Sequence, residues 1–520
     1  LAKANGKGSL ADSDEFRYML TKLGVNENTR GYAYFSDPFV RRLVGPRMKI
    51  AQRRRMLAKS QMEALTACSM LARIDAPGSN LDVEQLKVNG YLPTTWTATD
   101  LSIDDTGLVH SEIYGTLTDM RSLSEIPIQD ITSDEASAYK NYLDNYSRYW
   151  RRFFDPIAVR LDEPTPDQLE LQTFILPLVD NSIYNGLRVA MKTERKNQSL
   201  SVPLIEPTPV VKFSMNLSEQ GWQTITENFS DLFTLYSGAG SALLDDLGPS
   251  VHLAIFDSDP VIALGSGDVF GSFGSSFSGG NADAMLILPV ALSMLTRPCS
   301  VFVETQNPER TAQFLRQAAT IRTDERNRND DFNIQVYQEG NSDKWVWMMN
   351  VMGVIKLRYG IEIIDNYVVI RNIPWSSDER IIEVVPAELN AAALQISPAA
   401  CVEQLPGLFA AASDSNSRIA MSGLGRLFPF MLGNEKTIES AKSEHERLFG
   451  FHPKQVTGDL LTWKDNHLHS RDYGEPIRQR QPVFDPEKPF GLMNQIDFLR
   501  LNMQFEDDGL RSSIRWRTRQ

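Results

Sequence analysis

The sequence has 520 residues, of which 42% are hydrophobic and 23% are charged, and these proportions exclude a wholly disordered chain or a collagen. Lys and Arg number 53 against 66 Asp and Glu, so the net charge of -13 argues against a molecule built as a whole to neutralise nucleic acid. The three cysteines form no CxxC pair, so we expect neither a zinc finger nor a disulfide framework. The length favours three or four domains.

The N-terminal part divides into a polar lead and a helical region. Residues 1–30 are predicted to form a tail and contain no apolar core of a signal peptide. Because such polar leads are where linkers and proteolytic sites fall, we expect the chain to be part of a larger precursor or complex. Residues 31–205 are predicted to be mainly helical. A strand at Tyr32–Phe35 comes first, and Ser36-Asp37-Pro38 then signals a long helix that ends near Ala76.

The long helix carries an apolar face and a basic segment. The apolar face is expected to contain Leu57, Ala58, Met62, Leu65, Cys68 and Ala72. Between Pro38 and Ser60 lie eight basic and no acidic residues, namely Arg41, Arg42, Arg47, Lys49, Arg53, Arg54, Arg55 and Lys59. These side chains could contact a protein partner or an anionic surface such as a lipid headgroup. The alternative is a solvated helix face that pairs with the acidic remainder of the chain, or that flanks a partner interface.

A second helix is predicted to carry a ladder of aromatic residues. Thr132 to Glu135 is typical of a capping box. The residues that follow at spacings of three and four are Tyr139, Tyr142, Tyr146, Tyr149 and Phe153. This spacing favours packing in a core, and the alternative is stacking on sugars or on another helix. A further helical stretch is predicted at Gln168–Val179.

Residues 206–385 are predicted to form two strand–helix–meander units. In each, a strand (Val210–Leu217 or Ser300–Glu304) is followed by a helix (Ser218–Tyr236 or Pro308–Ile321). Further strands are predicted at Val251–Phe256, Val261–Leu264, Phe332–Gln338, Trp345–Leu357, Ile361–Ile364 and Tyr367–Arg371, with a hairpin turn at Asp365-Asn366. Consecutive strands without helical crossovers predict an α+β fold with antiparallel sheets and helices packed on one face.

Residues 386–520 are predicted to contain Ala-rich helices, over 386–445, and closing strands at Met493–Gln504 and Ile514–Arg519. The turn between these strands is expected at Asp507-Asp508-Gly509. No apolar stretch reaches the roughly 18 residues that a membrane helix needs, so no transmembrane segment is expected in this chain.

Two segments invite a chemical interpretation. The Gly- and Ser-rich stretch Gly265–Gly280 contains no complete dinucleotide or phosphate motif and no G-x-S-x-G elbow, so we expect a loop. His467 and His469 could reach one metal ion if they lie on a strand, with Asp465 or Asp472 as a third ligand. A turn near Asn466 favours two exposed histidines instead. We therefore predict no metal, no cofactor and no catalytic residue.

Several phrases resemble a known family. Tyr34–Pro46 and Tyr149–Leu161 are similar to signatures of large bacterial cell-envelope proteins of unknown function, and Leu448–Pro453 and Phe505–Leu510 resemble two more. Gly90–Pro93 looks like the segment after the first helix of type II secretion pseudopilins. The resemblance implies a pseudopilin-like N-terminal region and carries no catalytic residues.

Together these patterns favour a non-catalytic structural or interaction protein of the bacterial cell envelope, periplasmic or surface-exposed, working in a larger assembly. The first alternative is a glycan- or lipid-binding envelope module, and the second is a hydrolase with an unrecognised site. A protein partner or self-association is expected, and nucleic acid is not.

Overall fold

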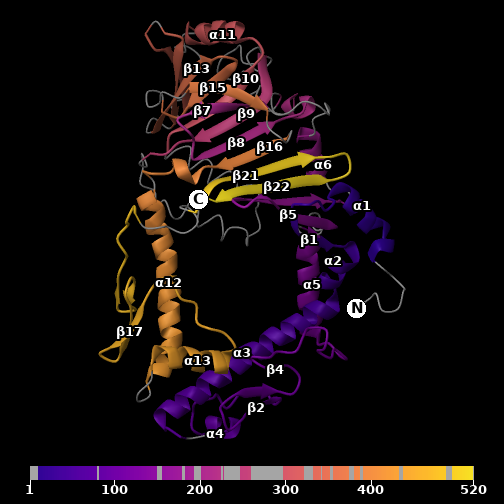
Figure 1. The fold of residues 1–520 in the computed structure, drawn as a ribbon, viewed down its shortest axis with the longest axis vertical. Helices are drawn as coiled ribbons and strands as arrows, with labels where there is room; N and C mark the ends of the chain where they lie inside the picture. The colour runs from indigo at the N-terminus through magenta and orange to yellow at the C-terminus, as the bar shows by residue number, and fades with distance from the viewer. Residues whose placement is uncertain are drawn as a thin grey trace. The chain divides into compact units, whose positions relative to one another are not determined.

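The structure, a computed structural model, describes residues 10–78, 81–148, 155–177, 182–191, 201–223, 227, 246–258, 297–320, 332–340, 342–351, 355–373, 380–386, 391–403, 405–432, 437–487 and 495–518 (Figure 1). The chain forms two compact units. Unit 1 comprises Leu1–Asp37, Arg151–Leu408 and Pro486–Gln520, and unit 2 comprises Pro38–Trp150 and Phe409–Asp485. Each unit is thus assembled from segments that are distant in the sequence, and the units cut across the four consecutive segments predicted above.

Unit 1 is built on a 13-stranded sheet in which every pairing is antiparallel. In spatial order the strands are β1 (Thr29–Phe35), β5 (Ile157–Thr165), β6 (Gln168–Ile175), β22 (Leu510–Thr518), β21 (Ile496–Phe505), β16 (Ala392–Ile396), β8 (Val211–Asn216), β9 (Leu247–Ile255), β10 (Cys299–Thr305), β14 (Tyr367–Arg371), β13 (Ile355–Ile364), β12 (Lys344–Val351) and β11 (Phe332–Gln338). A separate two-stranded sheet pairs β7 (Ser201–Glu206) with β15 (Arg380–Pro386).

The two faces of the large sheet carry different side chains and different covers. One face is apolar, and two helices pack on it: α6 (Ser182–Met191) near β8 and β21, and α11 (Pro308–Thr320) over β12 to β14. The opposite face is covered at one end by α1 (Asp14–Lys22) and at the other by β7 and β15. Two short 3-10 turns, η2 (Leu10–Asp12) and η4 (Pro398–Ala400), complete the described elements of unit 1.

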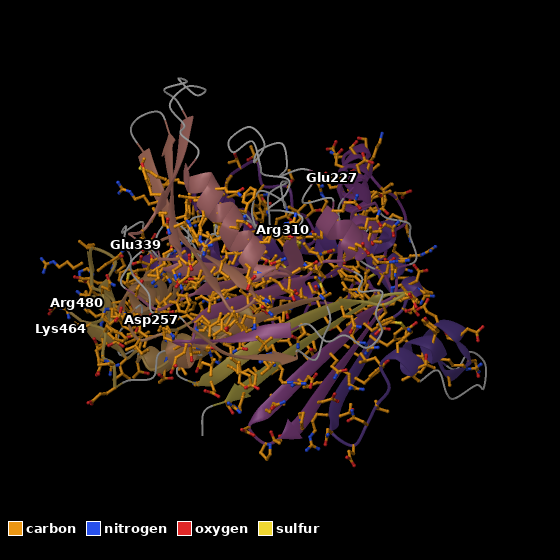
Figure 2. All side chains as sticks on the ribbon, turned by 90° about the horizontal axis from the view of Figure 1, so that it is seen from above. Glu227, Asp257, Arg310, Glu339, Lys464 and Arg480 are labelled. Atoms are coloured by element: carbon orange, nitrogen blue, oxygen red, sulfur yellow. The ribbon has the colours of Figure 1, made fainter. Side chains whose placement is uncertain are left out.

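Hydrogen bonds with the backbone, made by one side chain and by other backbone groups, hold two loops of unit 1. Asp257, labelled in Figure 2, accepts hydrogen bonds from the backbone N–H groups of Val402 (2.6 Å) and Glu403 (2.7 Å). At the turn after β13, Asp365 adopts a positive φ of 52°, and the Asn366 carbonyl accepts a hydrogen bond from the Thr305 N–H at 2.7 Å. The loop after β9 and the tip of the β13–β14 hairpin are therefore both tied to distant backbone.

Unit 2 contains the helices α3 (Pro46–Asp75), α4 (Val83–Val88), α5 (Ser133–Arg148) and α13 (Ile438–Phe449), and most of α2 (Asp37–Val44) and α12 (Leu405–Met431). Its small antiparallel sheets are β2 (Leu101–Ile103), β3 (Val109–Ser111) and β4 (Gly115–Thr116), and β17 (Leu461–Lys464), β18 (His467–Ser470), β19 (Gly474–Glu475) and β20 (Arg478–Gln479). Met62 and Leu65 of α3 lie in one core cluster, and Leu424 and Leu427 of α12 lie in another.

Local sequence explains where the helices of unit 2 begin and end. α3 starts with Pro46 at its first position, where a missing N–H costs nothing. α5 is preceded by the predicted capping box, in which Thr132 and Glu135 exchange hydrogen bonds of 3.2 and 3.0 Å. α13 has a capping box at Thr437 and ends at Gly450, whose φ of 76° is the left-handed conformation that favours glycine.

The structure confirms the predicted multi-domain α+β class with antiparallel sheets. The prediction of α11 is confirmed, and that of β14 is matched residue for residue. Of the predicted helix Ser218–Tyr236, only the start and residue 227 are described, and Val261–Leu264 and Gly265–Gly280 lie outside the described residues.

Four predictions are corrected. Gln168–Val179 is not a helix, because Leu169 and Leu171 alternate with polar residues and form strand β6. Trp345–Leu357 is not one strand, since Val351 pairs with Ile355 across a reversal of the chain. The Ala-rich 386–445 is not all helical, because it contains strand β16.

The fourth correction concerns the expected N-terminal tail. Residues 14–22 form helix α1, which is capped by Ser13, whose side-chain oxygen accepts a hydrogen bond from the Phe16 N–H. Met19 and Leu23 are buried against the sheet of unit 1. Apolar residues at helical spacing make this part of the otherwise polar N-terminal segment an amphipathic helix.

Candidate functional site: an exposed helix patch and an aromatic pocket in unit 2

The basic segment lies on α2 and α3, and its best-anchored member is Arg54. The Arg54 guanidinium donates to both carboxylate oxygens of Glu135, at 2.6 and 2.8 Å, and to the Asp130 carbonyl oxygen at 2.6 Å. The hydrogen bond from Arg54 lowers the pKa of Glu135 to about 2. Arg54 therefore joins α3 to the start of α5, as the alternative of pairing with the chain's own acids predicts.

Other members of the segment also have structural roles. Arg47 donates to the Ser124 carbonyl oxygen and Arg55 to the Arg121 carbonyl oxygen, each at 3.2 Å. The Lys49 ammonium lies 4.7 Å from the centre of the Tyr142 ring, and Lys59 pairs with Glu63 at 3.6 Å. The exposed side chains are Arg41, Arg42, Arg47, Arg53 and Lys59. Some of the predicted contact residues are thus internal anchors, and others, of which Arg47 and Lys59 also make internal contacts, are exposed to solvent.

Exposed apolar side chains accompany the cations on α3. Met56 is 63% exposed and Leu57 is 60% exposed, whereas the sequence placed Leu57 on the buried face. Arg53, Met56, Leu57 and Ser60 follow one another at helical spacing and are all exposed, so they form one continuous surface, here named the α3 patch. The apolar face instead buries Ala58, Met62 and Leu65. Leu57 was misplaced because it lies about 100° around the helix from the buried Ala58 and so falls outside the buried face.

Further along α3, the same helix forms one wall of a pocket of about 360 Å³. The α3 wall consists of Glu63, Ala67, Met70, Leu71 and Ile74. The remaining lining residues come from α12 and from the end of α13, namely Gly425, Arg426, Pro429, Phe430, His445, Phe449 and Phe451. All of these residues belong to unit 2.

Aromatic rings around His445 build the floor of the pocket. The His445 ring stacks on the Phe449 ring, with 4.8 Å between the ring centroids, and meets the Phe451 ring edge-on at a centroid distance of 4.9 Å. The Phe430 ring is tilted against His445, at a centroid distance of 5.5 Å. His445 Nδ1 lies 2.8 Å from the Phe451 carbonyl oxygen, so this nitrogen carries the proton. Burial lowers the pKa of His445 and outweighs the hydrogen bond to the Phe451 carbonyl oxygen, which raises it, and the positive charge of Arg426 lowers it further. His445 is therefore neutral near pH 7.

Arg426 supplies the permanent positive charge of the pocket. It is exposed, and its guanidinium lies 5.1 Å from the centre of the Phe451 ring. One turn along α12, Pro429 has no N–H to donate, so the Gly425 carbonyl oxygen lacks its usual helical donor. The pocket thus combines apolar walls, the cationic Arg426 and a backbone carbonyl oxygen, that of Gly425, without its helical hydrogen bond.

The other predicted candidates lie elsewhere. His467 and His469 are on β18 with ring centroids 6.4 Å apart, after a turn in which Asp465 and Asn466 have positive φ. His469 Nε2 lies 3.3 Å from the Lys464 carbonyl oxygen. Among the described residues, no three His, Cys, Asp or Glu side chains come together as a metal site needs.

The described members of the aromatic ladder pack, as predicted. Tyr142 lies 6.2 Å from Tyr139 and 6.1 Å from Tyr146 between ring centroids, and the Tyr139 hydroxyl donates to the Val44 carbonyl oxygen at 3.2 Å. Tyr149 and Phe153 lie outside the described residues.

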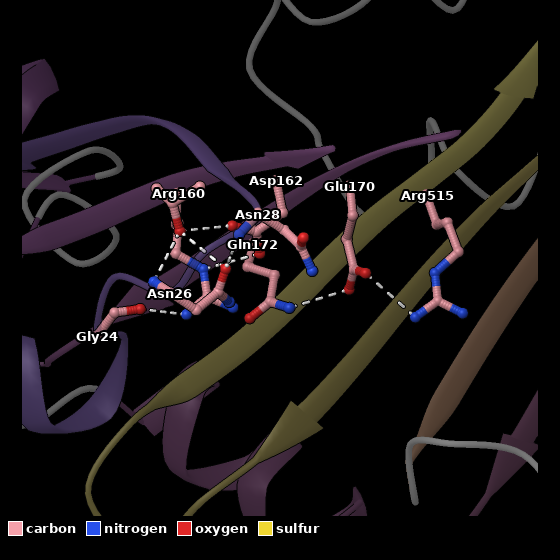
Figure 3. Close-up of polar contacts among 9 residues, drawn as sticks. Gly24, Asn26, Asn28, Arg160, Asp162, Glu170, Gln172 and Arg515 are labelled. Atoms are coloured by element: carbon pink, nitrogen blue, oxygen red, sulfur yellow. Dashed lines mark hydrogen bonds and ion pairs between the residues drawn. The ribbon is translucent and has the colours of Figure 1, made fainter. Parts of the chain in front are cut away.

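Unit 1 contains a row of polar side chains that the sequence did not predict. Strand register places the following residues side by side on one face of the sheet: Asp162, Glu170, Arg515, Arg500, Gln395 and Lys212. Figure 3 shows Glu170 between Gln172 (3.0 Å) and Arg515 (3.2 Å). Asp162 accepts from Arg160 at 2.8 Å, and Arg160 also donates to the Gly24 carbonyl oxygen. Of these contacts, Glu170 with Arg515 joins β6 to β22, Arg160 with Gly24 joins β5 to the loop before β1, and the other two lie within one strand, so all of them are structural.

Lys212, at the end of this row, and His252, on the neighbouring strand β9, are both buried and have lowered pKa values. Burial, with the charge of Arg500 adding to it, lowers the pKa of Lys212 to about 8. Burial lowers the pKa of His252 to about 3, and neither ring nitrogen of this fully buried residue has a hydrogen-bond partner among the described residues. Burial also raises the pKa of the Cys401 thiol to about 11, so this cysteine is a poor nucleophile near pH 7.

No protein-family model, curated protein or solved structure matches this chain. The resemblance to envelope proteins therefore stays a prediction. No described helix combines the length and the apolar character that crossing a bilayer requires.

Proposed function

We propose that this chain is a non-catalytic interaction protein that associates with further copies of itself through the α3 patch. The observation that carries the proposal is the exposure of Met56 and Leu57 beside Arg53 on a helix whose other face is buried. Contiguous exposed apolar side chains with a polar rim are typical of protein-binding surfaces, and Met and Arg are enriched there.

Charge supports a second copy as the partner. The segment that includes the α3 patch is basic, while the whole chain has a net charge of -13. The rest of the chain is therefore more acidic than the molecule as a whole, and each copy carries both complementary surfaces. Such complementarity orients two surfaces and speeds their encounter, while the apolar contact supplies affinity.

The test is the native mass measured by light scattering over a hundredfold range of concentration. We expect the wild-type mass to rise above that of one chain, and a Met56→Glu, Leu57→Glu double variant to remain a single chain. Val88→Glu is the matched control, because Val88 is 85% exposed on α4 of the same unit. A wild type that is monomeric throughout, or equal losses in the double variant and the control, would contradict the proposal.

The resemblance of Tyr34–Pro46 and Tyr149–Leu161 to envelope proteins supports a setting in the bacterial cell envelope. Immunodetection in fractionated cells of the source bacterium tests this part separately. We expect signal in the periplasmic or surface fraction, and signal confined to the cytosol would contradict it. The hydrolase alternative stays a hypothesis, since no specific arrangement of the described side chains favours it.

Ligand binding is the second candidate function, and the aromatic pocket of unit 2 favours it. The chemistry of that pocket is specific enough to suggest a ligand class.

A further inference from the structure

We propose that the pocket between α3, α12 and α13 binds a small alkyl carboxylate, with its chain against the aromatic floor and its carboxylate on Arg426. The site lies apart from the α3 patch, since none of Arg53, Met56, Leu57 and Ser60 lines the pocket. The two proposals can therefore fail independently.

Size and walls select an apolar ligand. A volume of about 360 Å³ is at the lower end of the roughly 300–1,000 Å³ typical of small-molecule sites. The floor is formed by Phe430, Phe449 and Phe451 around a neutral His445, and the α3 wall adds Met70 and Ile74. A slender alkyl chain fits such a pocket, because every methylene leaves water for an apolar surface.

Charge selects an anion at one end of that ligand. Arg426 presents a planar guanidinium whose paired N–H groups match the two oxygens of a carboxylate. The acid of the lining, Glu63, lies on the α3 wall and is paired with Lys59 at 3.6 Å. The carboxylate is therefore expected at the α12 side, and a cationic head group is disfavoured there.

Two of the exposed residues that line the pocket are small, and the exposed Leu71 and Arg426 lie beside them in the lining. Ala67 and Gly425 are both exposed lining residues, and a Cβ added at Gly425 would meet no atom within 4 Å. A larger side chain at Gly425 can therefore begin in open space beside the pocket without displacing protein atoms at its Cβ. Gly425→Leu is for this reason a blocking variant that should fold, since leucine also favours the helix more than glycine does.

The experiment is isothermal titration of the full chain with decanoate, decanol and decylamine. We expect one decanoate per chain, with decanol at least tenfold weaker and decylamine without measurable binding. Arg426→Gln should weaken decanoate at least tenfold and leave decanol unchanged, because a charge-assisted hydrogen bond contributes about that factor. Gly425→Leu should remove both ligands.

Two controls complete the design. Gly186→Leu in α6 changes another helical glycine whose added Cβ meets no atom within 4 Å, and it should leave decanoate binding unchanged. An N-acetylated peptide ending in a free-carboxylate Phe offers the same chemistry from a peptide C terminus and should bind at least tenfold more weakly than decanoate. Tighter binding of that peptide, equal affinity for decanoate and decylamine, or decanoate binding that survives Gly425→Leu would overturn the proposal.

Discussion

Replacing Lys212 by methionine is expected to stabilise unit 1 near neutral pH. Lys212 lies on β8 and is only 9% exposed, and its ammonium donates to the Pro203 carbonyl oxygen at 3.3 Å. Burial, with the charge of Arg500 adding to it, lowers its pKa from 10.5 to about 8. A methionine of similar length keeps the apolar stem and removes the buried charge.

The magnitude follows from the shift in pKa. A lowering from 10.5 to about 8 corresponds to a cost of about 3 kcal/mol at pH 7. The variant also leaves the Pro203 carbonyl oxygen without this donor, which costs about 1–2 kcal/mol. The expected net gain in the free energy of unfolding is therefore about 1–2 kcal/mol.

The dependence on pH gives the sharper test. Below pH 8 Lys212 is protonated in both states, so the wild type bears the full cost of the buried charge. Between pH 8 and 10.5 the unfolded chain binds more protons than the folded chain, and the stability of the wild type rises relative to the variant. At pH 10 the remaining cost is about 1 kcal/mol, and the advantage of Lys212→Met should vanish.

Calorimetric unfolding at pH 7 and pH 10 measures both effects. We expect Lys212→Met to raise the Tm of unit 1 by about 1–3 °C at pH 7 and not at pH 10. Lys464→Met, at an exposed lysine of unit 2, is the control and should change the Tm little at either pH. A lower Tm for Lys212→Met at pH 7, or the same rise at both pH values, would refute the reasoning.

Three further changes test local parts of the fold. Glu135→Gln should reduce the free energy of unfolding by about 1 kcal/mol at pH 7, after allowance for solvent screening. Because the pKa of Glu135 in the folded protein is lowered to about 2, denaturant titrations should show this loss disappearing as the pH falls from 4.5 toward 2. Gly450→Ala forces alanine into a φ of 76° and against the Leu117 carbonyl oxygen, and should lower stability by about 1–3 kcal/mol in the same titrations; an unchanged midpoint would contradict the account. Thr437→Ala removes the cap of α13, and thermal melts should show a loss of about 1 kcal/mol, with Thr437→Ser restoring it.

The parts of the fold that local patterns determine could be predicted from the sequence. The apolar, β-branched run within Tyr367–Arg371 forms β14, and the capping box at Thr132 begins α5. The helical prediction at Gln168–Val179 failed because a short segment of mixed polarity is compatible with either period, and pairing with β5 and β22 decided in favour of a strand.

Contacts between segments that are distant in the sequence could not be predicted from local patterns. The row from Asp162 to Lys212 depends on the register of strands from both ends of the chain. The pocket brings Ala67 of α3 and Phe449 of α13 together although they are far apart in sequence. The signals that the sequence offers are Gly425 and Pro429, two residues that are unusual in a helix interior, and the aromatic residues around Gly450.

Photo-crosslinking from position 57 tests the proposed self-association most directly. A benzophenone amino acid replaces Leu57 in one protein and Val88, which is also exposed, in another, and both are irradiated at the same concentration. The account predicts a covalent dimer from position 57, joined to an acidic segment of the second copy, that is weakened by salt. Equal yields from the two positions, or crosslinks from position 57 only within one chain, would contradict it.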